Sequence, residues 1–181
     1  MCKKLFSTAA LLCLAVLATQ AAEENPLKNA KVGDFVSHKI TTNAGGMAMN
    51  METKRTIINK TDTEVTIETC TKAMGHETKN TRVVKLDEKF DPKEIILKAQ
   101  PGATFKELGK GEETITVAGK AMKTTWTSYE LTGVGGQAAV SMKGKAWVCP
   151  DVPLGGMVKS ESDMGGRGTM TVELVDFGTA K

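Results

Sequence analysis

Apolar and polar residues alternate in short runs along most of this chain. Val65 and Ile67, for example, are flanked and separated by glutamate and threonine. The same period of two recurs at 47–54, 113–117, 140–148 and 170–174. Such alternation sends successive side chains to opposite faces of a β-strand, whereas an amphipathic helix needs a period of about 3.6 residues. The pattern therefore predicts strands that each have one apolar face.

Turn-forming residues separate these runs at short intervals. Glycine or asparagine clusters occur at 43–46, 59–62, 118–120, 133–136, 155–156 and 165–166. Short strands at regular spacing, joined by turns of this kind, favour an antiparallel meander that is curved or closed. The predicted fold class is all-β with minor α: a curved antiparallel sheet, or incomplete β-barrel.

Two segments could add a short helix. Asp91 is followed by Pro92, and Glu94 lies three residues after Asp91, which is typical of a capped helix start. The apolar residues that follow, up to Pro101, allow at most two turns and would fit an extended strand equally well. A second helical turn is possible at 25–29, opened by Pro26. The sheet is therefore expected to have at most one or two short helices.

The first 21 residues have the pattern of a secretory signal peptide. Lys3 and Lys4 precede an apolar run at 5–17, and Thr19 and Ala21 place small residues at the −3 and −1 positions of a cleavage site. We expect residues 1–21 to be removed and residues 22–181 to form a single antiparallel β domain. It would work in the periplasm or outside the cell, and no later apolar stretch is long enough for a membrane span.

Cys70 and Cys149 are the cysteines that would remain after cleavage. An even pair in an oxidising compartment suggests one disulfide. Two unpaired, inert thiols are the alternative. Spacing alone cannot decide, because pairing requires Cα atoms within about 7 Å. We expect the disulfide.

Charge argues against a nucleic-acid partner. The whole chain has a net charge of +3, and the loss of Lys3 and Lys4 with the signal leaves +1. Basic and acidic residues are interspersed, whereas a nucleic-acid-binding surface usually shows a basic block or stripe. The lysines are therefore expected to form an ordinary solvated surface.

The sequence offers little support for catalysis. It contains two histidines, His38 and His76, and no P-loop, dinucleotide fingerprint, zinc-binding helix or nucleophile elbow. His38 alternates with apolar residues and is expected to be a partly buried structural histidine. His76 follows Met74-Gly75 and is expected to be exposed in a turn. We predict a protein that is not an enzyme, with no catalytic residue, cofactor or metal ligand.

Methionine is unusually frequent and aromatic residues are few. Nine methionines follow the initiator, and aromatic residues make up 4% of the chain. Methionine can fill an ordinary core, line a pliable pocket for an acyl chain, or supply soft thioether ligands. The third use would pair the methionines at 47–51 with Met74 and His76 around Cu(I), although an alternating methionine stripe is far more often core. The residues expected to line an apolar, ligand-binding concavity are Met47, Met49, Met51, Val65, Ile67, Ile115, Val117, Val140 and Met142.

Both tryptophans fall within predicted strands. Trp126 and Trp147 are each expected to be protected from solvent on a face of the sheet. Trp147 shares its strand face with lysines, so it could instead cover the outer surface of the sheet together with the loop at 150–156.

Three stretches carry a family resemblance: residues 145–160 (KAWVCPDVPLGGMVKS), 27–35 (LKNAKVGDF) and 113–120 (ETITVAGK). Together they resemble uncharacterised secreted proteins of planctomycete-type bacteria, which are in turn similar to the periplasmic lipoprotein-carrier superfamily. That resemblance implies a half-barrel that wraps around a short helical plug and can hold lipid. This chain departs from the carriers in having little helix, and no ligand-binding residue carries over.

The function favoured at this point is a secreted, non-enzymatic binding protein that holds a hydrophobic small molecule, such as a lipid or acyl chain. One alternative is a structural or protein-interaction domain of the envelope without a cavity. A further alternative is a methionine-rich copper-binding protein.

Overall fold

The computed structural model of the protein describes residues 25–88, 93, 97, 102–133 and 141–179. The predicted signal peptide, Val140 and most of the possible helix at 91–99 lie outside the described residues. Of that last segment, Lys93 and Leu97 are described, and both are helical. Within the described part of the chain, no helix is long and apolar enough to cross a membrane.

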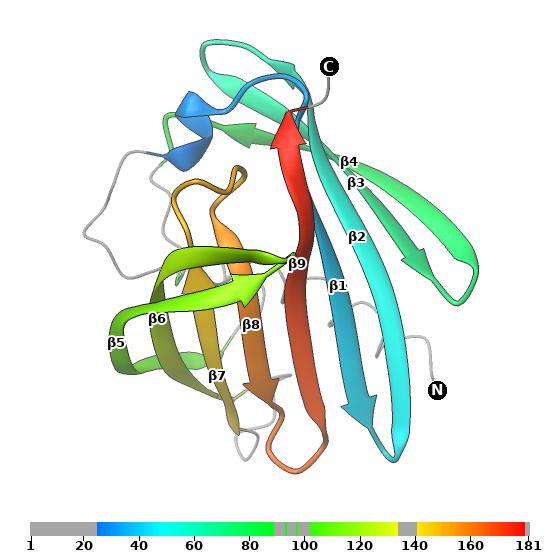
Figure 1. Ribbon diagram of the computed structural model, residues 1–181, viewed down its shortest axis with the longest axis vertical. Coiled ribbons are helices and arrows are strands. Elements are labelled where there is room, and N and C mark those ends of the chain that lie inside the picture. The colour runs from blue at the N-terminus through cyan, green and yellow to red at the C-terminus, as the bar shows by residue number, and fades with distance from the viewer. Residues whose placement is uncertain (1–24, 89–92, 94–96, 98–101, 134–140, 180–181) are drawn as a thin grey trace.

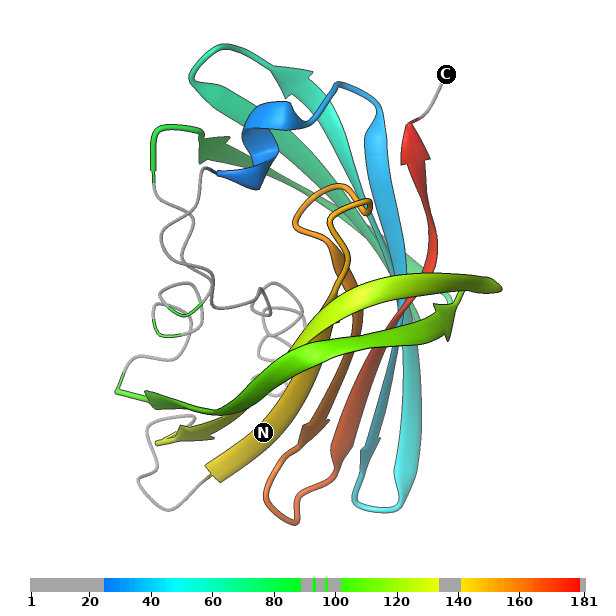
Figure 2. The ribbon, with the colours of Figure 1, turned by 60° about the vertical axis from the view of Figure 1, so that its left-hand side comes forward.

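The fold is one antiparallel sheet of nine strands in the order β4-β3-β2-β1-β9-β8-β7-β6-β5 (Figure 1). The strands are β1 (Asp34–Ala44), β2 (Met47–Lys60), β3 (Glu64–Ala73), β4 (His76–Lys85), β5 (Thr104–Val117), β6 (Lys120–Thr132), β7 (Ser141–Val148), β8 (Met157–Asp163) and β9 (Thr169–Thr179). The sheet curves strongly, and β4 and β5 remain as its two edges (Figure 2). The predicted fold class, an all-β curved antiparallel sheet or incomplete barrel, is confirmed.

Two meanders build this sheet, β1 to β4 and β5 to β9, and they meet where β1 pairs with β9. Most connections within the meanders are the predicted turns. Gly45 and Gly46, between β1 and β2, have φ angles of 59° and 78°, which glycine adopts without a Cβ penalty. The segment 118–120 forms the expected hairpin tip between β5 and β6.

The sequence pattern missed β4. Its residues are exposed except for Val84, which is half-buried, so no alternation of apolar and polar residues marks the strand. A charged, polar strand suits the edge of a sheet, because it discourages pairing with another chain. His76, expected in a turn, opens β4 directly after the turn at Met74 and Gly75, and it is exposed as expected.

A short 3₁₀ helix, η1 (Pro26–Asn29), lies on the concave side of the sheet (Figure 2). The side chain of Asn25 accepts a hydrogen bond from the backbone N–H of Leu27, and Pro26 presets the first helical turn. This confirms the helical turn predicted at 25–29. Leu27 inserts into the core from η1.

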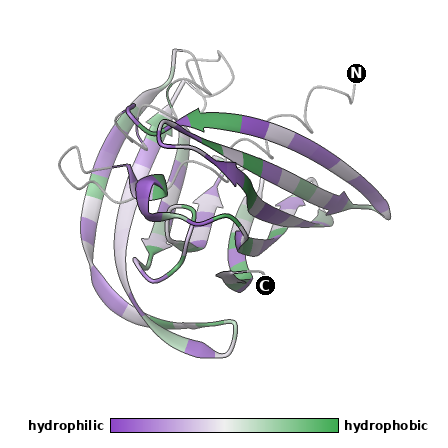
Figure 3. Ribbon diagram, turned by 90° about the horizontal axis from the view of Figure 1, so that it is seen from above, coloured by the Kyte–Doolittle hydropathy of each residue, from purple (hydrophilic) through white to green (hydrophobic). Residues whose placement is uncertain are grey.

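Two apolar clusters make up the core. The helix cluster, named for η1, consists of Leu27, Ala30, Val36, Ile57, Val65, Ile67, Leu86, Val117, Met122, Cys149, Val152, Leu154, Val158 and Leu174. The methionine cluster consists of Ile40, Tyr129, Leu131, Met142, Ala146, Met157, Met170 and Val172, with partly buried Met51, Phe105 and Met164 against it. Figure 3 shows the underlying alternation of hydrophobic and hydrophilic residues along the strands.

Both clusters use the same face of the central strands. On β1, Val36 belongs to the helix cluster and Ile40 to the methionine cluster, and residues four apart on a strand share a face. On β9, Leu174 of the helix cluster and Val172 of the methionine cluster are two residues apart and so also share a face. Because Leu27 of η1 packs in the helix cluster, this shared face is the concave one.

Candidate ligand-binding face

Strand register gathers the methionines at one end of the concave face. Met51, Ile40 and Val172 are aligned across β2, β1 and β9. The next aligned row contains Met49, Thr42 and Met170 on the same three strands. Met142 on β7 and Met157 on β8 complete the buried part of the cluster. Five methionines from four strands, β2, β7, β8 and β9, therefore meet on one surface, although they are scattered in sequence.

Two stacked aromatic rings border this cluster. The ring centroids of Phe105 and Tyr129 are 5.6 Å apart, with an angle of 19° between the ring planes. Tyr129 lies across from Gly144 on β7, and its ring atoms come within 2.5 Å of where a Cβ atom at residue 144 would be. Glycine at this position therefore lets the tyrosine ring lie flat on the neighbouring strand.

The predicted ligand-binding residues divide between the two clusters. Val65, Ile67 and Val117 are buried in the helix cluster, with Ile115 packed against it. Met142 is buried in the methionine cluster, and Met51 packs against it. Met47 and Met49, at the start of β2, are 70% and 37% exposed. Pairing of β3 with β2 begins at Met51, so the two exposed methionines lie beyond the end of β3.

The same face contains residues that the sequence analysis did not assign to it. Tyr129, Leu131, Met157 and Met170 are buried in the methionine cluster, and Met164 packs against it. Met170 lies in step with Val172 and Leu174, and polar residues separate the three, which is a usable signal. Its position beside Thr42 depends on the pairing of β1 with β9, which no local pattern reveals.

A neutral histidine separates the two clusters. His38 lies between Val36 and Ile40 on β1 and is 2% exposed. Its Nε2 donates a hydrogen bond of 2.9 Å to the backbone carbonyl of Met157, because a carbonyl oxygen can only accept. Burial, with a smaller contribution from the positive charge of Arg55, lowers the pKa of His38 to about 4. The expectation of a structural histidine is confirmed, and it is more deeply buried than expected.

Two buried hydroxyl groups on this face have no hydrogen-bond partner among the described residues. Thr42 on β1 is 7% exposed and Ser162 on β8 is 5% exposed. Within the part of the chain that the structure describes, neither Oγ1 of Thr42 nor Oγ of Ser162 makes a hydrogen bond. Buried hydroxyls without partners are uncommon in native structures.

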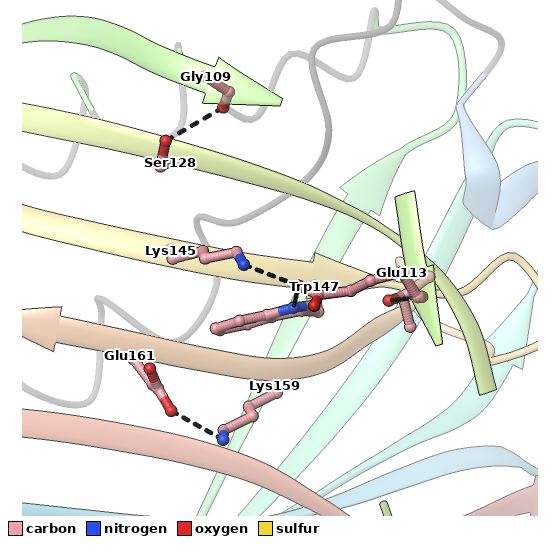
Figure 4. Close-up of polar contacts among 8 residues, drawn as sticks. Gly109, Glu113, Ser128, Lys145, Trp147, Lys159 and Glu161 are labelled. Carbon is pink, nitrogen blue, oxygen red and sulfur yellow. Dashed lines mark hydrogen bonds and ion pairs between the residues drawn. The ribbon is translucent and has the colours of Figure 1, made fainter. Parts of the chain in front are cut away.

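Trp147 follows Ala146 of the methionine cluster on β7, so it points to the opposite face of the sheet. Figure 4 shows Trp147 there with Lys145 and Glu113. Lys145 Nζ lies 4.3 Å from the ring centroid of Trp126 and 4.6 Å from that of Trp147. The same ammonium group contacts Glu113 Oε1 at 2.7 Å, and the indole N–H of Trp147 donates to that oxygen. Hydrogen bonds from Lys145 and then Trp147 lower the pKa of Glu113 below its ordinary value.

These contacts hold the β5–β6 hairpin against β7. Trp147 is 6% exposed and Trp126 is half-buried, so the expected protection is complete for Trp147 and partial for Trp126. The hairpin extends from β7 across β8 towards β9 (Figures 1 and 2). At its end, Lys120 Nζ lies 5.3 Å from the ring centroid of Phe177 on β9.

The expected disulfide between Cys70 and Cys149 is not formed, because both residues are free thiols. In the sheet order, β2, β1, β9 and β8 separate β3, which carries Cys70, from β7, which Cys149 follows. Cys149 is buried in the helix cluster. Cys70 lies three residues from Ile67, so it is on the face of β3 opposite that cluster. The two thiols are therefore kept apart by the order of the strands and by their positions on opposite faces of the sheet.

The geometry gives little for a metal ion to bind. Within the described ranges, no group of three or more histidine, cysteine, aspartate or glutamate side chains is placed to hold one. Nε2 of His38 is engaged with Met157, and His76 is exposed at the start of β4. What this end of the concave face offers chemically is apolar, deformable surface.

No protein-family model matches the chain, and no curated protein matches its sequence. Solved structures do match. One is a Bacteroides fragilis protein described as exported, with a YmcC-like fold; it has a TM-score of 0.52 and 11% identity, over 82% of this chain and 97% of that chain. Another, from Parabacteroides distasonis and described as a lipoprotein, has a TM-score of 0.52 and 11% identity, over 82% of this chain and 96% of that one.

At 11% identity these two similarities show the fold alone, which this chain shares with both proteins. A LolA-superfamily protein from Nitrosomonas europaea aligns over 92% of the chain, but its TM-score of 0.25 is too low to show a shared fold. The resemblance to bacterial secreted proteins is thus supported at the level of fold. Its planctomycete origin is not supported.

Proposed function

We propose that this protein is a secreted binding protein that holds a hydrophobic ligand, an acyl chain of a lipid, against the methionine cluster. The observation that carries the proposal is the continuity of methionine from buried core to exposed end on one face. Met170 is buried, Met51 is partly buried, and Met49 and Met47 extend the same face of β2 into solvent. An acyl chain could enter over the exposed methionines and lie on the partly buried ones.

Methionine suits this role physically. Its unbranched thioether side chain has three rotatable bonds and adapts to irregular apolar shapes better than branched residues do. Exposed apolar residues gathered at one end of a concave face are typical of interaction sites. A surface of this kind accepts chains of differing length without requiring one fixed shape.

Export fits the same role. The signal pattern at 1–21 would place residues 22–181 in the periplasm or outside the cell, where the protein would work without catalysing a reaction. The two proteins that share the fold are described as an exported protein and a lipoprotein. The proposed sequence of events is export, cleavage after Ala21, and binding of lipid in the envelope.

The test is uptake of a fluorescent fatty-acid analogue by the mature protein. Met49→Asp should strongly weaken uptake, because a carboxylate on the proposed entry path opposes contact with an acyl chain. Val83→Asp is the matched control, since Val83 is 55% exposed on β4 and is aligned with Thr66, which lies on the face of β3 opposite Val65 and Ile67. Both variants should unfold at the wild-type urea concentration.

Absence of uptake by the wild type would sink the proposal. Equal loss in both variants would also count against it, because the effect would then come from general surface charge. Native mass spectrometry of protein purified from its own envelope gives an independent result. Bound lipid supports the proposal, whereas bound copper or an empty protein would favour a metal-binding or a purely structural role.

A further inference from the structure

The two unpartnered hydroxyls occupy related positions. Thr42 on β1 and Ser162 on β8 are both aligned with Met170 on β9, one strand away on either side. Directly aligned residues in an antiparallel sheet point to the same face, so both hydroxyls lie on the concave face beside Met170. Each residue is more than nine-tenths buried, and neither hydroxyl makes a hydrogen bond to another described residue.

Burying a hydroxyl without a partner is unfavourable, because its hydrogen bonds to water are lost and not replaced. One such group could be a local accident of packing. Two of them flanking the same methionine, within the face proposed to bind lipid, indicate an acceptor that arrives with the ligand. This step rests on the proposed function.

The spacing indicates how many acceptors that ligand carries. Neighbouring strands are about 4.8 Å apart, so residues two strands apart are separated by about 10 Å. A single acceptor atom cannot bond to both hydroxyls, since each O–H···O bond spans only about 2.8 Å. The ligand therefore needs two acceptors several ångströms apart, one for each hydroxyl.

The surroundings indicate that these acceptors are neutral. Ile40 and Met49 lie beside Thr42, and Val172 is next to Met170 on the same face. His38, two residues before Ile40, is held neutral by burial. A carboxylate placed here would lose its hydration without gaining a cation from these neighbours, whereas a carbonyl requires only a hydrogen bond.

We propose that Thr42 and Ser162 donate hydrogen bonds to the two ester carbonyls of a diacyl glycerolipid whose chains lie on the methionine cluster. The site thereby selects ester-linked lipids carrying two acyl chains over free fatty acids. The side chain of Met170, which lies between Thr42 and Ser162, contacts the glycerol backbone between the two carbonyls.

The test compares two lipids that differ only in the carbonyls. Dioleoylglycerol and its dialkyl ether analogue, which has the same chains but no carbonyls, compete for binding to the mature protein against a fluorescent acyl probe. Wild type should bind the ester more tightly by about five- to tenfold for each hydroxyl engaged. Oleic acid should compete no better than the ether.

Removing the hydroxyls should remove this preference. Thr42→Val and Ser162→Ala should each weaken ester binding and leave ether binding unchanged, and the double variant should bind both lipids equally. Because each substitution removes a hydroxyl that has no partner, the free protein should be at least as resistant to urea as wild type. Thr171→Val is the control, since Thr171 neighbours Met170 on the other face of β9.

The possible failures are distinguishable. Lower resistance to urea together with unchanged lipid preference would show that the hydroxyls are structural, and would overturn this inference. Equal binding of ester and ether by wild type would also overturn it, while leaving the proposed function intact. Binding of neither lipid by wild type would overturn both.

Discussion

The indole ring of Trp126 lies against Gly111, its cross-strand partner on β5. Ring atoms of the indole lie 2.9 Å from the position that a Cβ atom at residue 111 would take. Real Cβ atoms do not approach other atoms so closely, so the glycine is what allows Trp126 to lie across the hairpin. Trp126 in turn lies beside the ammonium group of Lys145.

Gly111→Ala is therefore expected to destabilise the protein. The added methyl group must displace the ring of Trp126, and overpacking of this kind costs about 1–3 kcal/mol. Urea unfolding measures the effect. Gly109→Ala is the matched control, because the nearest atom to its Cβ position is the Ser128 hydroxyl at 3.4 Å, an ordinary contact. Equal stability of the two variants would contradict the proposed clash.

Burial of neutral His38 should make stability depend on pH. Its pKa is about 4 in the folded protein and 6.5 in the unfolded chain, so the unfolded chain binds the extra proton first as pH falls. The stabilisation from the neutral ring is complete above about pH 6.5 and is lost as pH falls towards 4. Between pH 7 and pH 5 the free energy of unfolding should drop by about 2 kcal/mol on this account.

His38→Gln provides the comparison, because its amide can still donate to the carbonyl of Met157 but does not titrate. The free energy of unfolding of this variant should change less than that of wild type between pH 7 and pH 5. Parallel pH profiles for the two proteins would show that His38 is not the group responsible.

Glu113 should couple the β5–β6 hairpin to β7 in a pH-dependent way. Its pKa is lowered in the folded protein, so its contribution is present above the ordinary pKa of glutamate and is lost as pH falls through the lowered value. Glu113→Gln should keep an acceptor for the indole of Trp147 but remove the ion pair with Lys145. Glu113→Ala should remove both.

The melting temperature should fall in the order wild type, Glu113→Gln, Glu113→Ala. Tryptophan fluorescence should show an acid-induced shift to longer wavelength in wild type that is reduced in both variants. A melting temperature for Glu113→Ala equal to that of wild type would mean that the contact adds nothing to stability.

Both thiols should react in unreduced protein that lacks residues 1–21. Denatured protein should bind two equivalents of a thiol reagent, one at Cys70 and one at Cys149. Without denaturant, Cys149 should react much more slowly than after unfolding, because it is buried in the helix cluster. Failure to label either cysteine after unfolding would restore the disulfide.

Local patterns in the sequence were sufficient for strands that have one buried face. Val65 and Ile67 alternate with polar residues and are buried as expected. The same pattern at 47–51 predicts a strand correctly but does not reveal how deeply each methionine is buried. That depends on where β3 ends relative to β2, which is set by the turn between β3 and β4.

Trp147 and β4 show what local patterns cannot predict. Trp147 alternates with lysines and yet is buried, because Glu113 from β5 and Lys159 from β8 close over it. β4 has no apolar face, so it is defined by its hydrogen bonds to β3 and not by its composition. The unpartnered hydroxyls of Thr42 and Ser162 likewise become recognisable only when the register aligns both with Met170.

The pairing of β1 with β9 also determines the order in which this sheet can be completed. β1 is the first strand to be synthesised, and its partner β9 is the last. During that interval β1 has one unsatisfied edge, which can pair with the wrong strand or with another chain. Contacts between residues so distant in sequence form slowly. The newly synthesised chain should therefore be most prone to aggregation just before β9, which has eleven residues, becomes available to pair.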